Sequence, residues 1–167
     1  MNHLIITAIG SDRPGIVSEL SGVVTSHGAN VEESRMARLG SDFAILMLVS
    51  VQPDWQEALE LSLQSISGLS ITTKGTDSSS LESGKLSRIH LEGADNEGIV
   101  QVLSNYLADK SINITELETH ISHAPVSGTP LFNLNASVSI PEEVNADDIQ
   151  DGLAHIAHKL GVEIQLD

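Results

Sequence analysis

The sequence predicts an α+β fold made of two copies of one βαββαβ module, each a four-stranded antiparallel sheet with two helices on one face. A glycine turn that begins at Gly10 returns 83 positions later at Gly93, and a repeat of this length indicates a duplicated unit. Strand-like and helix-like patterns also follow the same order in both halves of the chain. Right-handed crossovers then place both helices of a module on the same face of its sheet. The positions that match without a gap are Gly10/Gly93, Asp12/Asp95, Gly15/Gly98, Ile16/Ile99, Val17/Val100, Leu20/Leu103, Asn30/Asn113 and Glu33/Glu116.

The first repeat opens with an apolar, β-branched run at residues 3–9, which predicts a strand that ends at Gly10. Pro14 is expected at the first helical position, where a missing N–H costs nothing. The helix that follows should bury one stripe and stop near Gly28. That stripe consists of Ile16, Leu20, Val23, Val24 and His27.

Residues 31–39 and 43–51 flank a short polar turn, and this pattern predicts a β-hairpin. A second amphipathic helix follows and stops at Gly68, and residues 69–73 are expected to close the sheet. The apolar positions that mark this helix are Trp55, Leu59, Leu63 and Ile66.

The second repeat has the same order, with strands expected at residues 86–92, 112–122, 131–140 and 162–166. Its two helices carry apolar stripes at Ile99, Leu103, Tyr106 and Leu107 and at Ile149, Leu153, Ile156 and Leu160. Phe43 matches Phe132 at a spacing of 89, whereas the earlier positions match at 83, so the second hairpin is six residues longer than the first. We therefore expect a first domain at residues 1–74, a polar, glycine-bounded linker at 75–85 and a second domain at 86–167.

Strand side chains alternate between the two faces of a sheet, so aligning the copies predicts which residues point away from the helices. In the second copy these residues are polar: Arg88, His90, Glu92, Asn133, Asn135, Ser137 and Ser139. In the first copy they are mostly apolar: Ile5, Thr7, Ile9, Ala44, Leu46, Leu48 and Ser50. An apolar sheet face is rarely left in water, so we expect it to be covered by the other copy, by a second chain or by a partner protein. Strand propensity alone would also place isoleucine there. Homo-oligomer formation or inter-domain sheet pairing would use Ile5, Ile9, Ala44, Leu46 and Leu48.

Composition excludes several classes of function. Eight basic against 23 acidic residues give a formal net charge of −15, which would repel a phosphate backbone, so direct nucleic-acid binding is not expected. The chain has no cysteine, hence no disulfide framework, thiolate zinc site or cysteine nucleophile. The amino end shows no basic leader and no apolar run approaches membrane-spanning length, so we expect a cytoplasmic protein.

The duplicated Gly-x-Asp-x-x-Gly turn is where several chemical roles converge. Gly15 and Gly98 let the backbone approach a ligand, and the helix start offers unpaired N–H groups to a carboxylate. Asp12 and Asp95 could hold an ammonium group, and Asn30 and Asn113 could contact the same molecule, so the constellation suits a zwitterionic amino acid. Singly, each residue is also a plain structural device, since Asp often caps helices and Asn favours turns. Glu97 replaces Pro14 in the second copy and makes its turn less suited to a carboxylate.

The run from Leu4 through Gly15 to Val17, followed by the run from Asn30 to Phe43, resembles the ACT domain, a regulatory amino-acid-binding module. More narrowly, the chain is similar to repressors of the glycine cleavage system that consist of two ACT domains. The resemblance implies a ferredoxin-like fold, an amino-acid effector with glycine expected, and repression through contact with a DNA-bound transcription activator. It places the ligand at the strand-to-helix turn and at the start of the second strand, often between two domains. The ligand-binding residues carried over are Asp12, Arg13, Gly15 and Asn30, with Asp95, Gly98 and Asn113 in the second copy. Where other members have a histidine ahead of the turn, this chain has Gly10.

No catalytic residues, metal or cofactor are expected. His155 and His158 lie i, i+3 on a helix, and His120 and His123 are close to Glu116, but zinc usually requires three or four ligands in fixed geometry. The sequence also lacks the nucleophile-elbow, phosphate-loop and HExxH motifs. Two classes of function remain, which are an amino-acid-responsive transcriptional regulator and an ACT-type regulatory subunit of a metabolic enzyme.

Overall fold

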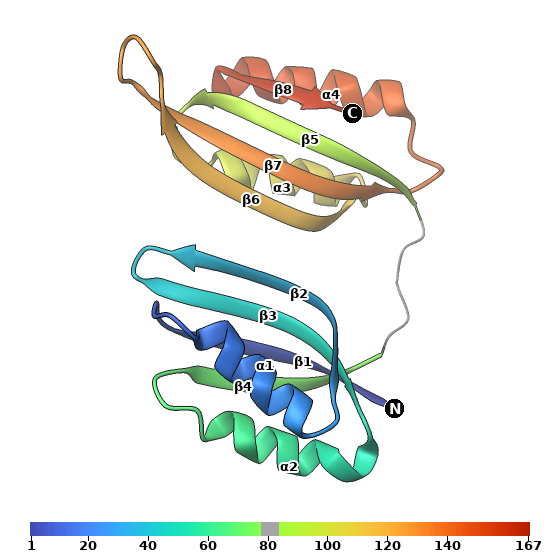
Figure 1. Cartoon of the computed structure of the whole chain (residues 1–167). Coiled ribbons are helices and arrows are strands. Elements are labelled where there is room, and N and C mark those ends of the chain that lie inside the picture. Colours follow the sequence, from blue (N-terminus) through green and yellow to red (C-terminus); the bar gives the residue numbers. More distant parts are fainter. Residues whose placement is uncertain (78–83) are drawn as a thin grey trace. The chain divides into compact units, whose positions relative to one another are not determined.

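A computed structural model of the chain describes residues 1–77 and 84–167. The chain divides into two compact units, Met1–Ser80 and Leu81–Asp167. Each unit has the predicted order βαββαβ (Figure 1). The first contains β1 (Asn2–Ser11), α1 (Ile16–Ser26), β2 (Asn30–Leu39), β3 (Asp42–Val51), α2 (Pro53–Gln64) and β4 (Ser70–Thr76). The second contains β5 (Lys85–Ala94), α3 (Ile99–Asp109), β6 (Asn113–His123), β7 (Pro130–Ile140), α4 (Ala146–Leu160) and β8 (Val162–Leu166).

The two sheets share one topology. Strand order is β2-β3-β1-β4 in the first unit and β6-β7-β5-β8 in the second, and every pairing is antiparallel. The edge strands β2 and β6 shift register at equivalent places, between Val31 and Glu33 and between Ile114 and Glu116. Because a bulge bends and twists its strand, its recurrence shows that the copies share backbone detail as well as order.

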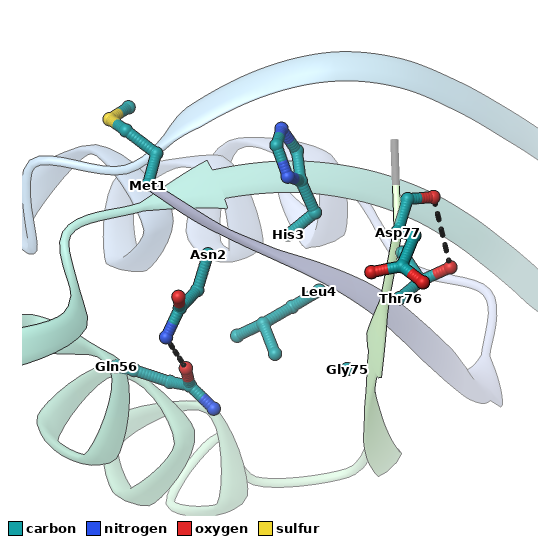
Figure 2. A pocket seen from close by; sticks show the side chains of 8 residues that line it. All are labelled: Met1, Asn2, His3, Leu4, Gln56, Gly75, Thr76 and Asp77. Carbon is teal, nitrogen blue, oxygen red and sulfur yellow. Dashed lines mark hydrogen bonds between the residues drawn. The ribbon is translucent and has the colours of Figure 1, made fainter. Parts of the chain in front are cut away.

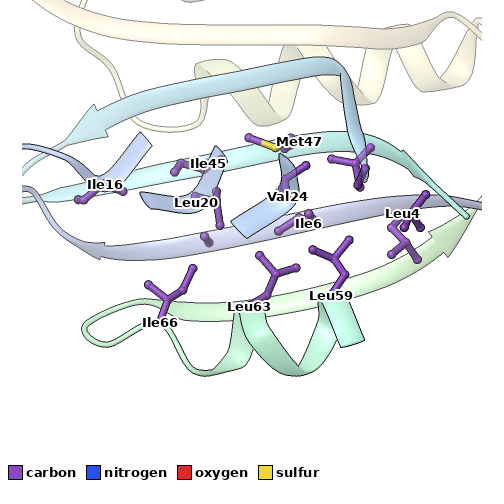
Figure 3. Packing of buried hydrophobic residues seen from close by; sticks show 14 residues of the cluster. Leu4, Ile6, Ile16, Leu20, Val24, Ile45, Met47, Leu59, Leu63 and Ile66 are labelled. Atoms are coloured by element: carbon purple, nitrogen blue, oxygen red, sulfur yellow. The ribbon is translucent and has the colours of Figure 1, made fainter. Parts of the chain in front are cut away.

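The core of the first unit lies between one face of the sheet and its two helices (Figure 3). Leu20 and Val24 of α1 and Leu59 of α2 are fully buried against the inward residues of the strands. Burying one such aliphatic side chain stabilises the folded state by about 1.5–3 kcal/mol. The inward strand residues are Leu4, Ile6, Ala8, Ile45, Met47, Val49 and Val51.

The outer faces of the sheets differ as the alternation predicted. On the first sheet Ile9 and Leu46 are 52% and 47% exposed. On the second sheet the inward residues Ile89, Leu91 and Leu134 are buried, and polar residues point the other way. Asn133 lies on that outer face and is nevertheless buried, and its amide donates to Oγ of Ser122 (2.9 Å) and to the carbonyl of Leu131 (3.1 Å).

Three local expectations require correction. Helix α1 begins at Ile16, so Pro14 lies in the preceding turn and not at the first helical position. Trp55 was expected on the buried stripe of α2 but is 53% exposed, whereas Leu59, Leu63 and Ile66 are buried in the core.

The third correction concerns the expected linker at residues 75–85. Strand β4 continues to Thr76, because Gly75 and Thr76 pair with Leu4 and His3 of the long strand β1. At the other end, Lys85 pairs with Ile140 and already belongs to β5. Residues 78–83 of that linker lie outside the described residues.

The end of β1 is crowded by the strand that closes the sheet. A Cβ added at Gly10 would overlap the carbonyl oxygen of Gly68 and lie 2.8 Å from Cδ2 of Leu69. The equivalent Gly93 packs as closely, since its Cβ would lie 2.8 Å from Cα of Val162. Glycine at this position is therefore a packing requirement.

In the second unit, Tyr106 of α3 packs against α4. Its hydroxyl donates to the carbonyls of Asp148 (3.2 Å) and Ile149 (3.3 Å). The phenol occupies the space that a side chain at Gly152 would fill. Burial, and secondarily the nearby carboxylates of Asp148 and Asp151, raise the pKa of the Tyr106 phenol. The phenol therefore keeps the proton that it donates to α4.

We predict that Gly10→Ala lowers the free energy of unfolding by about 1–3 kcal/mol, because overpacking against a backbone carbonyl forces β1 and β4 apart. Urea denaturation measures the change. Gly75→Ala is the matched control in β4, since nothing lies within 4 Å of its Cβ position. Equal midpoints for the two variants would contradict the close approach at Gly10.

Candidate functional site

The turn between β1 and α1 depends on one glycine. Gly15 occupies the N-cap position of α1 with φ 91° and ψ −6°, a left-handed conformation that residues with a side chain rarely adopt. No atom lies within 4 Å of its Cβ position, so the requirement for glycine comes from the backbone conformation and not from crowding. The amide of Asp12 donates to the carbonyl of Ser41 (3.0 Å) and fixes the turn to the hairpin between β2 and β3.

This N-cap leaves the first amides of α1 without a side-chain partner. A glycine offers no oxygen, and within the described residues no side chain accepts a capping hydrogen bond at the start of α1. The first N–H groups of a helix have no intrahelical acceptor and carry a partial positive charge. The amides at Ile16 and Val17 thus form a local site of positive potential in an acidic protein.

A cavity of about 500 Å³ opens beside these amides. Three predicted ligand-binding residues, Asp12, Arg13 and Gly15, line it. The side chain of Asp12 is exposed, whereas the Arg13 guanidinium pairs with Glu19 at 2.5 Å. A carboxylate that could meet an ammonium group therefore lies on the same wall as amides that could meet a carboxylate.

Sequence reasoning missed the remaining lining residues. Ser18 and Ser21 lie i, i+3 on α1 and bring hydroxyls to the cavity, and Phe43 pairs with Gly10 across the sheet and supplies an aromatic wall. The helical spacing of the two serines was a usable signal. Phe43 could have been placed there only from the register of β1 with β3.

The structure does not bring Asn30 to this cavity. Asn30 pairs with Ser50, which pairs with His3, so it lies at the opposite end of the sheet from Asp12. The eight steps from His3 to Ser11 span about 26 Å at roughly 3.3 Å per residue. The expectation that Asn30 contacts the same small molecule as Asp12 is therefore wrong within one unit. The same register separates Asn113 from Asp95 in the second unit.

The second turn keeps the backbone of the first and changes its side chains. Gly98 has φ 83° at the N-cap of α3, again without a side-chain cap among the described residues. Asn96, in the place of Arg13, donates to the carbonyl of Leu160 (3.3 Å) and ties the turn to the end of α4. Asp95 and Glu97 are both exposed and both acidic, which disfavours a ligand carboxylate at this turn.

A larger hollow of about 760 Å³ lies at the other end of the first sheet (Figure 2). The side chain of Asn2 lies over α2 there and donates to Oε1 of Gln56 (2.7 Å), and Asp77 is the one acidic side chain on its wall. It contains none of the predicted ligand-binding residues. Its walls are formed by Met1, Asn2, His3, Leu4, Gln56, Gly75, Thr76 and Asp77.

The described residues contain no group of three or more His, Cys, Asp or Glu side chains placed to hold a metal ion. Within the same residues, none of the helices has the length and apolar character needed to span a membrane.

Comparison with known proteins gives the family of the first unit. Residues 2–74, which include β1, α1 and the cavity between them, match the model of the ACT domain. The chain contains an ACT domain. Both units of this ACT-domain protein have the ferredoxin-like arrangement expected from the sequence.

The relatives of this ACT-domain protein include a named regulator. A stretch of 49 residues is 51% identical to the glycine cleavage system transcriptional repressor of Escherichia coli (strain K12). That stretch covers 29% of this chain and 26% of the repressor, so the match spans about a quarter of the relative's length.

Two solved structures match almost the whole chain. An unknown protein from Galdieria sulphuraria is 36% identical with a TM-score of 0.83, over 99% of this chain and 97% of that one. A structure assigned to a glycine cleavage system transcriptional repressor is 26% identical with a TM-score of 0.69, over 99% of this chain and 96% of that one. The chain is thus similar to the glycine cleavage repressor in part of its sequence and in its fold.

We predict that Gly15→Ala lowers the free energy of unfolding by about 1–2 kcal/mol, the cost of a left-handed backbone for a residue with a Cβ. Gly22→Ala, in the middle of α1, should raise it by about 0.5–1 kcal/mol, because Gly22 has open space around it and no positive φ. Urea denaturation of the two variants gives the sign of each change. A destabilised Gly22→Ala, or an unaffected Gly15→Ala, would contradict the assigned start of α1.

Proposed function

We propose that the chain is an amino-acid-responsive regulator of the glycine cleavage repressor type. Its effector is a small amino acid, with glycine expected, which binds at the turn between β1 and α1 of the first unit. The regulator acts on transcription by contact with a DNA-bound activator and does not bind DNA itself.

The observation that carries this proposal is the cavity beside the uncapped amides of α1. A carboxylate placed at Ile16 and Val17 would gain hydrogen bonds and the favourable end of the helix dipole. The ammonium group of the same molecule would lie on the side of Asp12. The ammonium group can approach without any side chain moving aside, since the Asp12 side chain is already exposed. Asn30 can reach this ligand only if another copy of the module supplies it.

The charge of the chain supports action through a protein partner. A net charge of −15 opposes approach to a phosphate backbone, whose binding proteins neutralise phosphates with Lys and Arg. A regulator that does not touch DNA must act on transcription through a protein that does.

Titration calorimetry with glycine tests the effector site. We predict that wild-type protein binds glycine and that Asp12→Asn weakens binding at least tenfold, because the ammonium group loses its counter-charge. Acetate, which lacks the ammonium group, should bind the wild type no better than glycine binds the variant. Asp95→Asn is the matched control, since it removes the equivalent carboxylate from the second turn. Absence of binding by glycine, alanine and serine alike, or a larger loss in Asp95→Asn, would refute the first turn as the site.

The apolar outer face of the first sheet supports a further part of the proposal, which is that the chain self-associates. Thr7, Ile9 and Leu46 line a shallow groove of about 490 Å³ on this face, and most of its lining is apolar. Removing these side chains from water would stabilise an association of two chains.

We predict that the wild type sediments as more than one chain and that Leu46→Glu shifts it to a single chain, because a charge would then be buried in the interface. Analytical ultracentrifugation gives the masses. Val126→Glu is the control, since Val126 is fully exposed on the hairpin between β6 and β7. A wild type that stays monomeric at tens of micromolar would contradict self-association.

A further inference from the structure

Two copies of this chain repel each other over much of their surface. The formal net charge is −15, and like charges that meet across an interface destabilise it. Two copies therefore meet most easily at a surface that is close to neutral. The outer face of the second sheet is acidic, since four acidic residues point the same way as Arg88: Glu92, Glu116, Glu118 and Glu163.

The outer face of the first sheet is closer to neutral. Within the described residues, the formal charges of its strands nearly balance, with Glu32, Glu33 and Asp42 against Arg35 and Lys74. The same face carries the apolar groove that contains Ile9 and Leu46. A second copy therefore meets less repulsion on this face than on the second sheet, and it meets apolar surface as well.

The residues of this face stand in rows that cross the strands. Glu33 of β2 pairs with Leu48 of β3, and Leu48 pairs with Ile5 of β1. Ile5 in turn pairs with Lys74 of β4. Because directly paired residues of neighbouring strands share a face, this row has a carboxylate at one edge of the sheet and an ammonium group at the other. We call these four residues the charged row.

Polar side chains beside the charged row have partners on the same face. The hydroxyls of Thr7 and Thr72 are hydrogen-bonded to each other, and Nη2 of Arg35 lies 2.9 Å from Oε1 of Glu33. Lys74 is exposed and makes no ion pair within the described residues. Its ammonium group is therefore a charge that a partner can still satisfy, and a carboxylate would do so.

A second copy of this face supplies the carboxylate. Sheets that pack face to face keep their strands within about 30° of each other. A two-fold axis parallel to the strands, midway between β3 and β1, places β2 of each copy opposite β4 of the other. This axis keeps each row at the same level along the strands. Glu33 then lies opposite Lys74 of the second copy, and Leu48 lies opposite Ile5.

The other face-to-face arrangement lacks this match. A two-fold axis that crosses the strands would place β4 of one copy opposite β4 of the other. The ammonium group of Lys74 would then meet the outward residues of β4, which include no acidic residue: Ser70, Thr72, Lys74 and Thr76. The charged row therefore distinguishes the two orientations of a dimer.

We propose that two chains associate through the outer faces of their first sheets, about a two-fold axis parallel to the strands, with Glu33 of each copy paired to Lys74 of the other. The inference rests on the self-association in the proposed function and adds its geometry. Ile5, Leu46 and Leu48 supply the apolar contact, and the two ion pairs fix the orientation of the copies.

Charge reversal at either end of the charged row tests this pairing by sedimentation equilibrium, which gives the dissociation constants. Glu33→Lys and Lys74→Glu should each weaken the dimer at least tenfold, because like charges then meet at both edges of the interface. Net charge alone would predict opposite effects, since the first change makes the chain less acidic and the second makes it more acidic. Glu57→Lys on α2 and Lys110→Glu after α3 are the matched controls, because both residues are exposed and lie outside this face. Each control should stay within about threefold of the wild type.

An equimolar mixture of the two single variants shows whether the pair forms between chains. In a mixed dimer one chain contributes two basic side chains and the other two acidic ones, so opposite charges again meet at both edges. The mixture should therefore dimerise within about threefold of the wild-type affinity, although neither variant does so alone. The double variant Glu33→Lys, Lys74→Glu should recover affinity in the same way.

The outcomes separate this inference from the proposed function. If the wild type dimerises but charge reversal does not weaken the dimer, or if the mixture associates no better than the single variants, the pairing of Glu33 with Lys74 is wrong while self-association stands. If the wild type sediments as a single chain at tens of micromolar, self-association fails and the inference fails with it. Neither result bears on the effector site, which the glycine titration tests separately.

Discussion

Gly15 turns the chain from β1 into α1 with a left-handed backbone, and the chemistry of the first unit depends on that turn. A residue with a side-chain oxygen at the N-cap would satisfy one of the first amides itself, as serine or aspartate does in many helices. Glycine supplies no such oxygen, no side chain caps the start of α1, and no atom lies within 4 Å of the Cβ position of Gly15. The same residue that permits the turn therefore creates an anion site that needs no basic side chain. This matters in a protein with few cations, one of which, Arg13, is already paired with Glu19.

Duplication reproduced the backbone of the module but not its surfaces. Gly98 repeats the conformation of Gly15, and Gly93 repeats the close approach of Gly10 to the closing strand. The outer sheet face is apolar in the first unit and polar in the second, and the exposed indole of Trp55 has no counterpart on α4. Core positions are constrained by packing in both copies, whereas surface positions are free to acquire different partners. Under the proposed function, the first unit carries the ligand site.

The repeat and the alternation of apolar residues were sufficient to predict the order of elements and the inward residues of both sheets, because these features follow from periodicity alone. Asn30 was expected beside Asp12, but the crossover from β1 through α1 puts the start of β2 at the opposite end of the sheet. Phe43 was missed at the cavity because periodicity alone does not give the register between strands. Trp55 was assigned to the core because its spacing fits the stripe, but the structure leaves it exposed while Leu59, Leu63 and Ile66 are buried. The role of Gly10 required knowledge of the Gly68 backbone, which is distant in sequence.

The central claim is that the first amides of α1 hold the carboxylate of a small amino acid. The most direct measurement is a ¹H–¹⁵N correlation spectrum of the full chain recorded during addition of glycine. The account predicts that the amide resonances of Ile16, Val17 and Ser18 move most, in the direction expected for a new hydrogen bond to an anion, while those of Ile99 and Val100 move less. Glycine-induced shifts confined to residues outside the β1–α1 turn, with these three amides unaffected at saturation, would contradict it.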